Sequence, residues 1–189
     1  MKKTNLDILD LPDNPVHMSR FGHATVVDVV FDILPQEITA NLDKEIMKES
    51  SDDPDQKFKD MVNHHYPPSY KKATKWLDEG KTSYDNKDYK HASYCFGVAS
   101  HYISDTFMAP HCVSRESNKD HHNFEKAIDT ITPKADYLKG DLESLMIKGV
   151  EQGQKDWKIW KRTKDISIVQ SEADEAASTF YSIMKNILS

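Results

Sequence analysis

The most constraining feature of the sequence is a long apolar stretch that carries a histidine and an aspartate near its end. Residues 88–109, DYKHASYCFGVASHYISDTFMA, are expected to form one long helix, which Pro110 ends. His101 and Asp105 lie four residues apart, so they project from one face of this helix. Their neighbours are apolar, and a charged aspartate is costly there unless it is paired or binds a metal. The stretch therefore predicts a helical core with polar chemistry built into it.

Helical periodicity also dominates the rest of the chain, and no run alternates convincingly with the period of a strand. In residues 23–34 one stripe consists of His23, Val27, Val30 and Leu34, and Pro35 ends the helix. Further helices are expected over residues 35–50, 53–66, 69–81, 121–131, 135–160 and 171–188, the last one behind Ser171. The predicted fold class is all-α, a compact bundle of about seven to nine helices with a polynuclear metal site in its core cleft.

Length and charge limit the organisation of the chain and its partners. Its 189 residues are expected to form a single domain over residues 1–189, in which residues 1–20 are an N-terminal extension. The net charge of −6 argues against a nucleic-acid surface built on basic patches, so no stable nucleic-acid binding is expected. Cys95 and Cys112 are too few for a disulfide framework and are expected to be reduced and mostly buried.

The N-terminal segment, MKKTNLDILDLPDNP, begins with two lysines, but acids and a proline interrupt it before an apolar run of signal length develops. No segment approaches the ~20 apolar residues of a membrane span. As written, the chain is expected to be cytoplasmic, or secreted if a leader has been lost. At most a transient contact with membranes is expected, and the sequence indicates no particular oligomeric state.

A second histidine–acid pair follows the first one closely. His121 and Glu125 have the same spacing of four residues, and His111 stands between the two pairs, just after Pro110. A single pair of this kind is usually a surface salt bridge or a satisfied histidine. Two pairs with a third histidine leave a solvated polar face and a metal site as equally good interpretations.

Three residues elsewhere in the chain favour the metal site. His23 lies on an aliphatic stripe and should point inward, while Asp55 precedes His64 by 9 residues. Helical bundles build polynuclear metal sites from ligands that project inward from facing helices. Mixed imidazole and carboxylate ligands suit zinc, with iron or manganese possible, and eight ligands suit two or three ions. The eight candidates are His23, Asp55, His64, His101, Asp105, His111, His121 and Glu125. The histidines that fit less well are His17, His91 and His122, and His91 is expected at the surface.

In this order the residues resemble the zinc-dependent phospholipases C, a family that includes the catalytic domain of clostridial alpha-toxins. The resemblance spans residues 23–125 and is highly specific as a combination, although each motif alone is weak. The motifs are FGHATVV with His23, Pro54-Asp55, HHYPP with His64, HYISD with His101 and Asp105, APH with His111, and HHNFE with His121 and Glu125.

The resemblance also implies how the ligands divide among two or three zinc ions. One ion would be held by Asp55, His64, His101 and Asp105, and a second by His111, His121 and Glu125. A third would share Asp105 and take His23, together with the amino group and carbonyl of an N-terminal tryptophan. No tryptophan precedes His23 here, and His17 is a candidate substitute. His65 is the alternative to His64 in HHYPP.

The activity that the resemblance implies is hydrolysis of a phosphodiester, such as that of a phospholipid headgroup, by a metal-activated water. Asp55 would orient or deprotonate that water. The aromatic residue that follows Pro-Asp in members that cleave phosphatidylcholine is Gln56 here, with Phe58 and Tyr66 as potential substitutes. One alternative is a nuclease or nucleotidase of the related single-strand-specific zinc family, which usually has His-x-x-x-Asp where this chain has Glu125. Another is a non-catalytic metal-binding helical protein.

Overall fold

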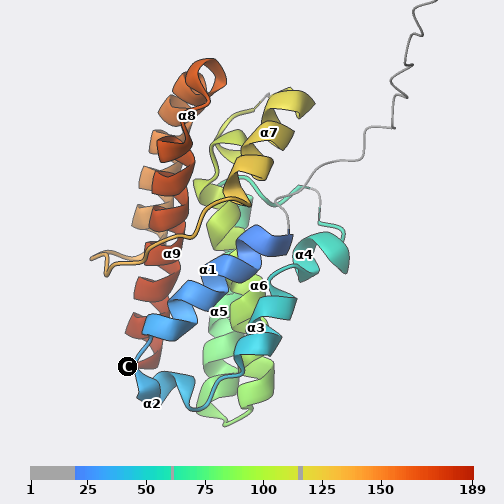
Figure 1. The fold of residues 1–189 in the computed structure, drawn as a ribbon. Helices are drawn as coiled ribbons and strands as arrows, with labels where there is room; N and C mark the ends of the chain where they lie inside the picture. Colours follow the sequence, from blue (N-terminus) through green and yellow to red (C-terminus); the bar gives the residue numbers. More distant parts are fainter. Residues whose placement is uncertain (1–19, 61, 115–116) are drawn as a thin grey trace, which may run out of the picture.

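The computed structural model describes residues 20–60, 62–114 and 117–189, and its regular structure in these ranges is entirely helical. The predicted all-α bundle is confirmed (Figure 1). None of the helices in this part of the chain is both long and apolar enough to cross a membrane. The helices are α1 (Arg20–Ile33), α2 (Gln36–Thr39), α3 (Lys44–Ser50), α4 (Asp53–Gln56), α5 (Pro68–Asp85), α6 (Tyr89–Phe107), α7 (Asn118–Ile128), α8 (Leu142–Thr163) and α9 (Ile166–Leu188), with a short 3₁₀ helix η1 (Ala109–Cys112) between α6 and α7.

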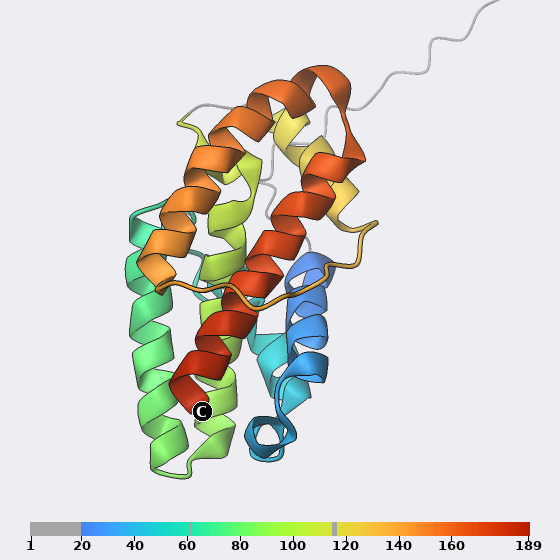
Figure 2. The same ribbon diagram turned by 90° about the vertical axis from the view of Figure 1, so that its left-hand side faces the viewer.

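Helix α6 is the central element of the bundle. Every residue from Cys95 to Phe107 is buried, which fits its largely apolar sequence. Helix α5 packs along it, and α1, α3, α8 and α9 contact its other sides. Figure 2 shows the α5–α6 pair on one side of the molecule and the long α8–α9 pair crossing in front of α6. Helix α6 is therefore packed against several other helices, and the turns that carry His101 and Asp105 are buried.

Two of the expected helices in the first half of the chain are wrong. Residues 35–50 form α2 and α3 rather than one helix, because the Asp43 carboxylate accepts from the Ile46 backbone N–H at 3.0 Å and begins a new helix. The helix expected over residues 53–66 is only the single turn α4. Lys59 then adopts a left-handed φ of 52°, which is incompatible with continuing the helix.

Further helices have other ends than expected, and α7 runs over Asn118–Ile128 instead of residues 121–131. Helix α5 continues through Gly80 to Asp85, because this glycine is a packing residue: a Cβ there would lie 2.6 Å from the Phe96 ring on α6. Helix α8 begins at Leu142 instead of residue 135, with Asp141 as its cap. Helix α9 begins at Ile166 behind Asp165, so the predicted start at Ser171 is wrong and that serine lies inside the helix.

A second glycine predicts a measurable effect on stability. Gly97 of α6 faces α3, and a Cβ at this position would overlap the carbonyl oxygen of Met47. Because backbone cannot move aside cheaply, we expect Gly97→Ala to lower the free energy of unfolding by about 1–3 kcal/mol, although alanine is the better helix former. Denaturant unfolding of the full chain measures this change.

Gly153→Ala is the matched control for this substitution. Its Cβ would meet the Cys112 thiol at 2.5 Å, which is a side chain that can rotate. We therefore expect a smaller loss there than at Gly97. An equal or larger loss at Gly153 would show that overlap with the Met47 carbonyl costs no more than overlap with the Cys112 thiol.

Candidate metal centre

The last turns of α6 supply the middle of the candidate site. The side chains of His101 and Asp105 are buried, and Nε2 of His101 lies 3.3 Å from Oδ2 of Asp105. Nδ1 of His101 donates to the carbonyl oxygen of Ser51, at the end of α3, over 2.8 Å. With its proton on Nδ1, the imidazole turns the lone pair of Nε2 towards the carboxylate. Metal-binding histidines are commonly oriented by such a second hydrogen bond.

His23 joins this pair from α1, where it lies on the same stripe as Val27 and Val30. Its ring stacks on that of His101 with the centroids 4.0 Å apart, and its Nε2 lies 3.5 Å from Oδ1 of Asp105. The side chain is fully buried, and neither of its ring nitrogens has a hydrogen-bond partner. A buried imidazole without partners is costly. A metal ion between His23, His101 and Asp105 would remove that cost.

Asp55 and His64 approach the same point from the opposite side. Oδ1 of Asp55, on α4, lies 3.5 Å from Nε2 of His64 and 3.6 Å from Nε2 of His101. His64 also contacts the Asp105 carboxylate through Nδ1 and the Asp60 carbonyl oxygen through Nε2. The donor atoms thus form two groups of three, each within 4.8 Å: His23, His101 and Asp105, and Asp55, His64 and His101.

The two histidines of HHYPP have different positions in the structure. His64 is buried beside Asp105, whereas His65 is exposed and its Nδ1 donates to the carbonyl oxygen of His111 over 2.6 Å. The geometry therefore places His64 among the candidate ligands and gives His65 a role in holding His111.

The other three candidates form an adjoining group. His111 lies on η1, and its ring centroid is 5.0 Å from that of His121 and 5.8 Å from that of His64. On α7, Nε2 of His121 lies 3.1 Å from Oε1 of Glu125, and both His111 and Glu125 are buried. Nδ1 of His111 is buried without a hydrogen-bond partner. This group contacts the α6 cluster through the rings of His64 and His111.

Groups that the sequence did not point to hold several of these side chains. The buried Glu172 carboxylate of α9 accepts from the Ala109 backbone N–H at 2.9 Å, at the start of the turn that carries His111. The Tyr102 hydroxyl donates to the Asp60 carboxylate at 2.8 Å, which fixes the segment whose carbonyl contacts His64. Of these supporting contacts, the sequence could have indicated that of Glu172, because an acid stands there on a largely apolar helix face. The contacts through the carbonyls of Ser51 and Asp60 leave no pattern in the sequence.

Burial and mutual charge set the protonation of the site. Burial lowers the pKa of His111 to about 3, and burial together with His101 lowers that of His23 well below its usual value. Burial raises the pKa of Asp55 to about 7, against His101, which lowers it. Asp105 is also buried, but the surrounding histidines, His101 first, hold its pKa well below the usual range. Burial lowers the pKa of His64 and of His101, but the Asp105 carboxylate outweighs it and raises that of His64 to about 9 and that of His101 above its ordinary value. Metal binding to these two imidazoles would therefore release their protons, whereas His23 and His111 are already neutral.

The remaining histidines have no close place in this arrangement. His17 lies outside the described residues. The side chain of His122 is 43% exposed, 4.0 Å from Glu125, and that of His91 is 43% exposed on the first turn of α6. His91 nevertheless has partners of its own, which are described below.

Fold and site together define a class: a helical bundle with a buried histidine–carboxylate centre whose donor set suits zinc. The family model described as zinc dependent phospholipase C matches residues 22–186. The chain belongs to this family.

Among the solved structures with the same fold is the alpha-toxin of Clostridium perfringens isolated from the avian strain SWCP. It superimposes with a TM-score of 0.63 at 15% sequence identity and covers 89% of this chain. The match covers 63% of the toxin chain, so this chain spans less than two thirds of its length. No curated protein matches the sequence.

Proposed function

We propose that the chain is a zinc-dependent phosphodiesterase that hydrolyses phospholipids or related phosphodiesters by a phospholipase C reaction. The observation that carries this proposal is the convergence of His23, Asp55, His64, His101 and Asp105 on one buried point. Family membership supports the chemistry, because the family is defined by its zinc dependence.

The ligand assignment is part of the proposal. Asp55, His64, His101 and Asp105 would hold one zinc ion, and His111, His121 and Glu125 a second. His23 and Asp105 would take part in a third. Bound zinc would supply Lewis acidity, lowering the pKa of a bound water towards ~7 and stabilising charge on the phosphate oxygens.

Asp55 is the residue that we assign to proton transfer. Its Oδ1 faces both His64 and His101, so the carboxylate lies beside the position proposed for the zinc ion and for a water bound to it. Before metal binds, burial raises its pKa to about 7, whereas a bound zinc ion would lower this pKa and keep Asp55 ionised as a proton acceptor. In the proposed reaction Asp55 orients the attacking water and takes up its proton, while the histidines and Asp105 stay in place.

A cleft beside the centre offers room for the substrate. It has a volume of about 640 Å³, and His111, Tyr66, Val113, Val150 and Lys158 are among its lining residues. Lys158 adds a cation that attracts a phosphate, and Tyr66 adds an aromatic face suited to a quaternary ammonium group. Phe58 lines a separate depression with Trp76. Of the two potential substitutes for the missing aromatic residue at position 56, Tyr66 is therefore the one that we propose.

Parallel hydrolysis assays test this proposal. We expect the zinc-loaded chain to cleave a chromogenic phosphocholine ester and the headgroup of phosphatidylcholine vesicles, to lose this activity on chelation, and to regain it with zinc. Single-stranded DNA serves as the competing substrate. Cleavage of DNA alone would replace the proposal by the nuclease, and no hydrolysis of any of them by a zinc-loaded chain would favour a non-catalytic metal-binding protein.

A further inference from the structure

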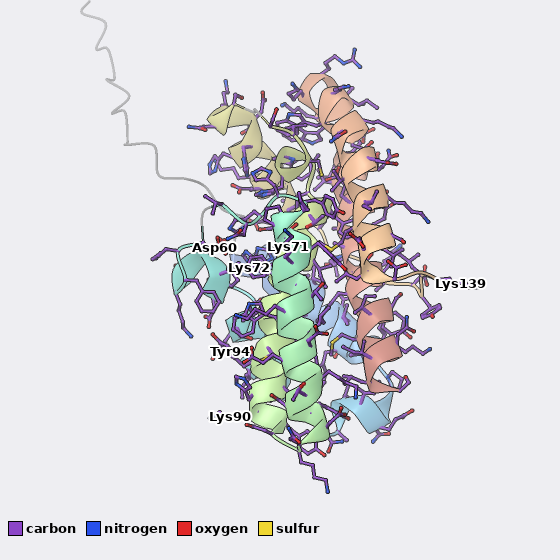
Figure 3. The ribbon with its side chains drawn as sticks, turned by 180° about the vertical axis from the view of Figure 1, so that it is seen from behind. Asp60, Lys71, Lys72, Lys90, Tyr94 and Lys139 are labelled. Carbon is purple, nitrogen blue, oxygen red and sulfur yellow. The ribbon has the colours of Figure 1, made fainter. Side chains whose placement is uncertain are left out.

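A second cluster of metal-ligand side chains lies on the opposite half of the α5–α6 pair. Nε2 of His91 lies 2.9 Å from Oε1 of Glu79 and 3.4 Å from Sγ of Cys95. His91 and Cys95 are four residues apart on α6, and Glu79 faces them from α5. Figure 3 marks the location through the neighbouring Lys90 and Tyr94, which lie towards the other end of the helix pair from Asp60.

The packing of the two helices explains why these three side chains meet. Position 80 is a glycine, and a Cβ there would lie 3.1 Å from Cβ of Cys95 and closer still to the Phe96 ring. Because Gly80 has no Cβ, α6 can approach α5 closely, and the Cys95 thiol lies beneath the side chain of His91 in the preceding turn of α6. Cys95 is fully buried, whereas the side chains of Glu79 and His91 are 42% and 43% exposed. The cluster thus has an inner sulfur donor and an outer side that is open to solvent.

The donor atoms match those of a three-ligand zinc site. Zinc binds thiolate sulfur at ~2.3 Å, imidazole nitrogen at ~2.0–2.1 Å and carboxylate oxygen at ~2.0–2.2 Å. Around a tetrahedral ion these bond lengths place the donors roughly 3–4 Å from one another. The His91–Cys95 separation of 3.4 Å lies within that range, and the His91–Glu79 separation of 2.9 Å lies just below it. All donor atoms of the group lie within 4.8 Å of one another.

We propose that Glu79, His91 and Cys95 form a peripheral zinc site that joins α5 to α6, with the fourth coordination position open to water. Burial raises the pKa of the Cys95 thiol to about 12 without metal, so the ion would displace its proton on binding. Thiolate and carboxylate would then carry two negative charges, which neutralise the ion. The alternative is a Glu79–His91 ion pair beside a thiol that binds no metal. The site is separate from the proposed active centre and stands independently of the proposed function.

The thiol provides a spectroscopic test. The full chain is reduced, freed of metal by chelation, dialysed and then titrated with cobalt(II). Cobalt(II) bound by a thiolate gives a sulfur-to-cobalt charge-transfer band in the near ultraviolet. The proposed active centre has only nitrogen and oxygen donors, so its cobalt shows weak visible bands and no such band. We expect the wild-type chain to show the charge-transfer band and Cys95→Ser to lose it. In Glu79→Gln, the cobalt concentration at half saturation of the band should rise by at least about tenfold.

Cys112→Ser is the matched control, because the Cys112 thiol is buried and donates to the Thr106 carbonyl at 3.3 Å. This variant should keep the band. A band that survives in Cys95→Ser, or a wild-type chain that shows only the visible bands, would overturn the peripheral site while leaving the active centre in place. A charge-transfer band with a single equivalent of bound cobalt per chain, all of it lost in Cys95→Ser, would keep the peripheral site and count against the proposed function. No cobalt binding at all would contradict both.

Discussion

Asp105→Asn is expected to cost the protein most of its zinc and at least about a hundredfold of its hydrolytic activity. The Asp105 carboxylate faces three candidate ligands: His23 at 3.5 Å, His101 at 3.3 Å, and His64 in direct contact. An asparagine keeps the shape but loses the charge that offsets the ions and the ability to bridge two of them. Zinc content per chain and kcat/KM of the purified variant measure the effect.

Asp156→Asn provides the comparison for that experiment. Asp156 is also a buried aspartate, but it lies on α8 and accepts from the Gln152 side chain at 2.9 Å. We expect this variant to keep its zinc and its activity. If both variants lost zinc to the same extent, the loss would reflect general destabilisation, and the central role given to Asp105 would be wrong.

Asp55→Asn has a different expected outcome: most of the zinc stays bound, while kcat falls by roughly 10²–10⁴-fold. His64, His101 and Asp105 still hold the ion in this variant, but an amide cannot accept the proton of the attacking water. KM should change little, because the substrate cleft is intact. Steady-state kinetics together with zinc analysis separate this result from a loss of metal.

Asp53→Asn is the neighbouring control for Asp55. Asp53 is equally buried on α4, but its carboxylate pairs with Lys57 at 3.0 Å. This variant should retain kcat. Unchanged turnover in Asp55→Asn would remove Asp55 from the mechanism, and a parallel loss of zinc and activity would make it a ligand only.

The helices with long apolar stripes could be predicted from the sequence, and those that depend on a local cap could not. The stripe of α1 and the apolar run of α6 are strong periodic signals, and both helices lie where they are expected. Helices α3, α8 and α9 begin behind Asp43, Asp141 and Asp165, whose carboxylates cap backbone N–H groups. Each of these aspartates stands in a polar segment where periodicity cannot tell a cap from an ordinary helical residue.

The candidate ligands could be predicted from the sequence because metal chemistry requires particular residue types, and a spacing of four residues brings two of them to one helix face. The groups that orient these ligands could not be predicted. Ser51 and Asp60 act through backbone carbonyls, which every residue possesses. The contacts of His91 could not be predicted from spacing along the sequence. Its partner Glu79 comes from another helix, and only the packing at Gly80 brings the two together.

The most direct test of the central claim is the zinc content of the chain purified without chelators. The Cys95→Ser variant should be used, so that the peripheral site contributes nothing to the count. A centre built from the eight residues between His23 and Glu125 predicts two to three zinc ions per chain, lost on dialysis against a strong chelator. Fewer than one zinc ion per chain would contradict it.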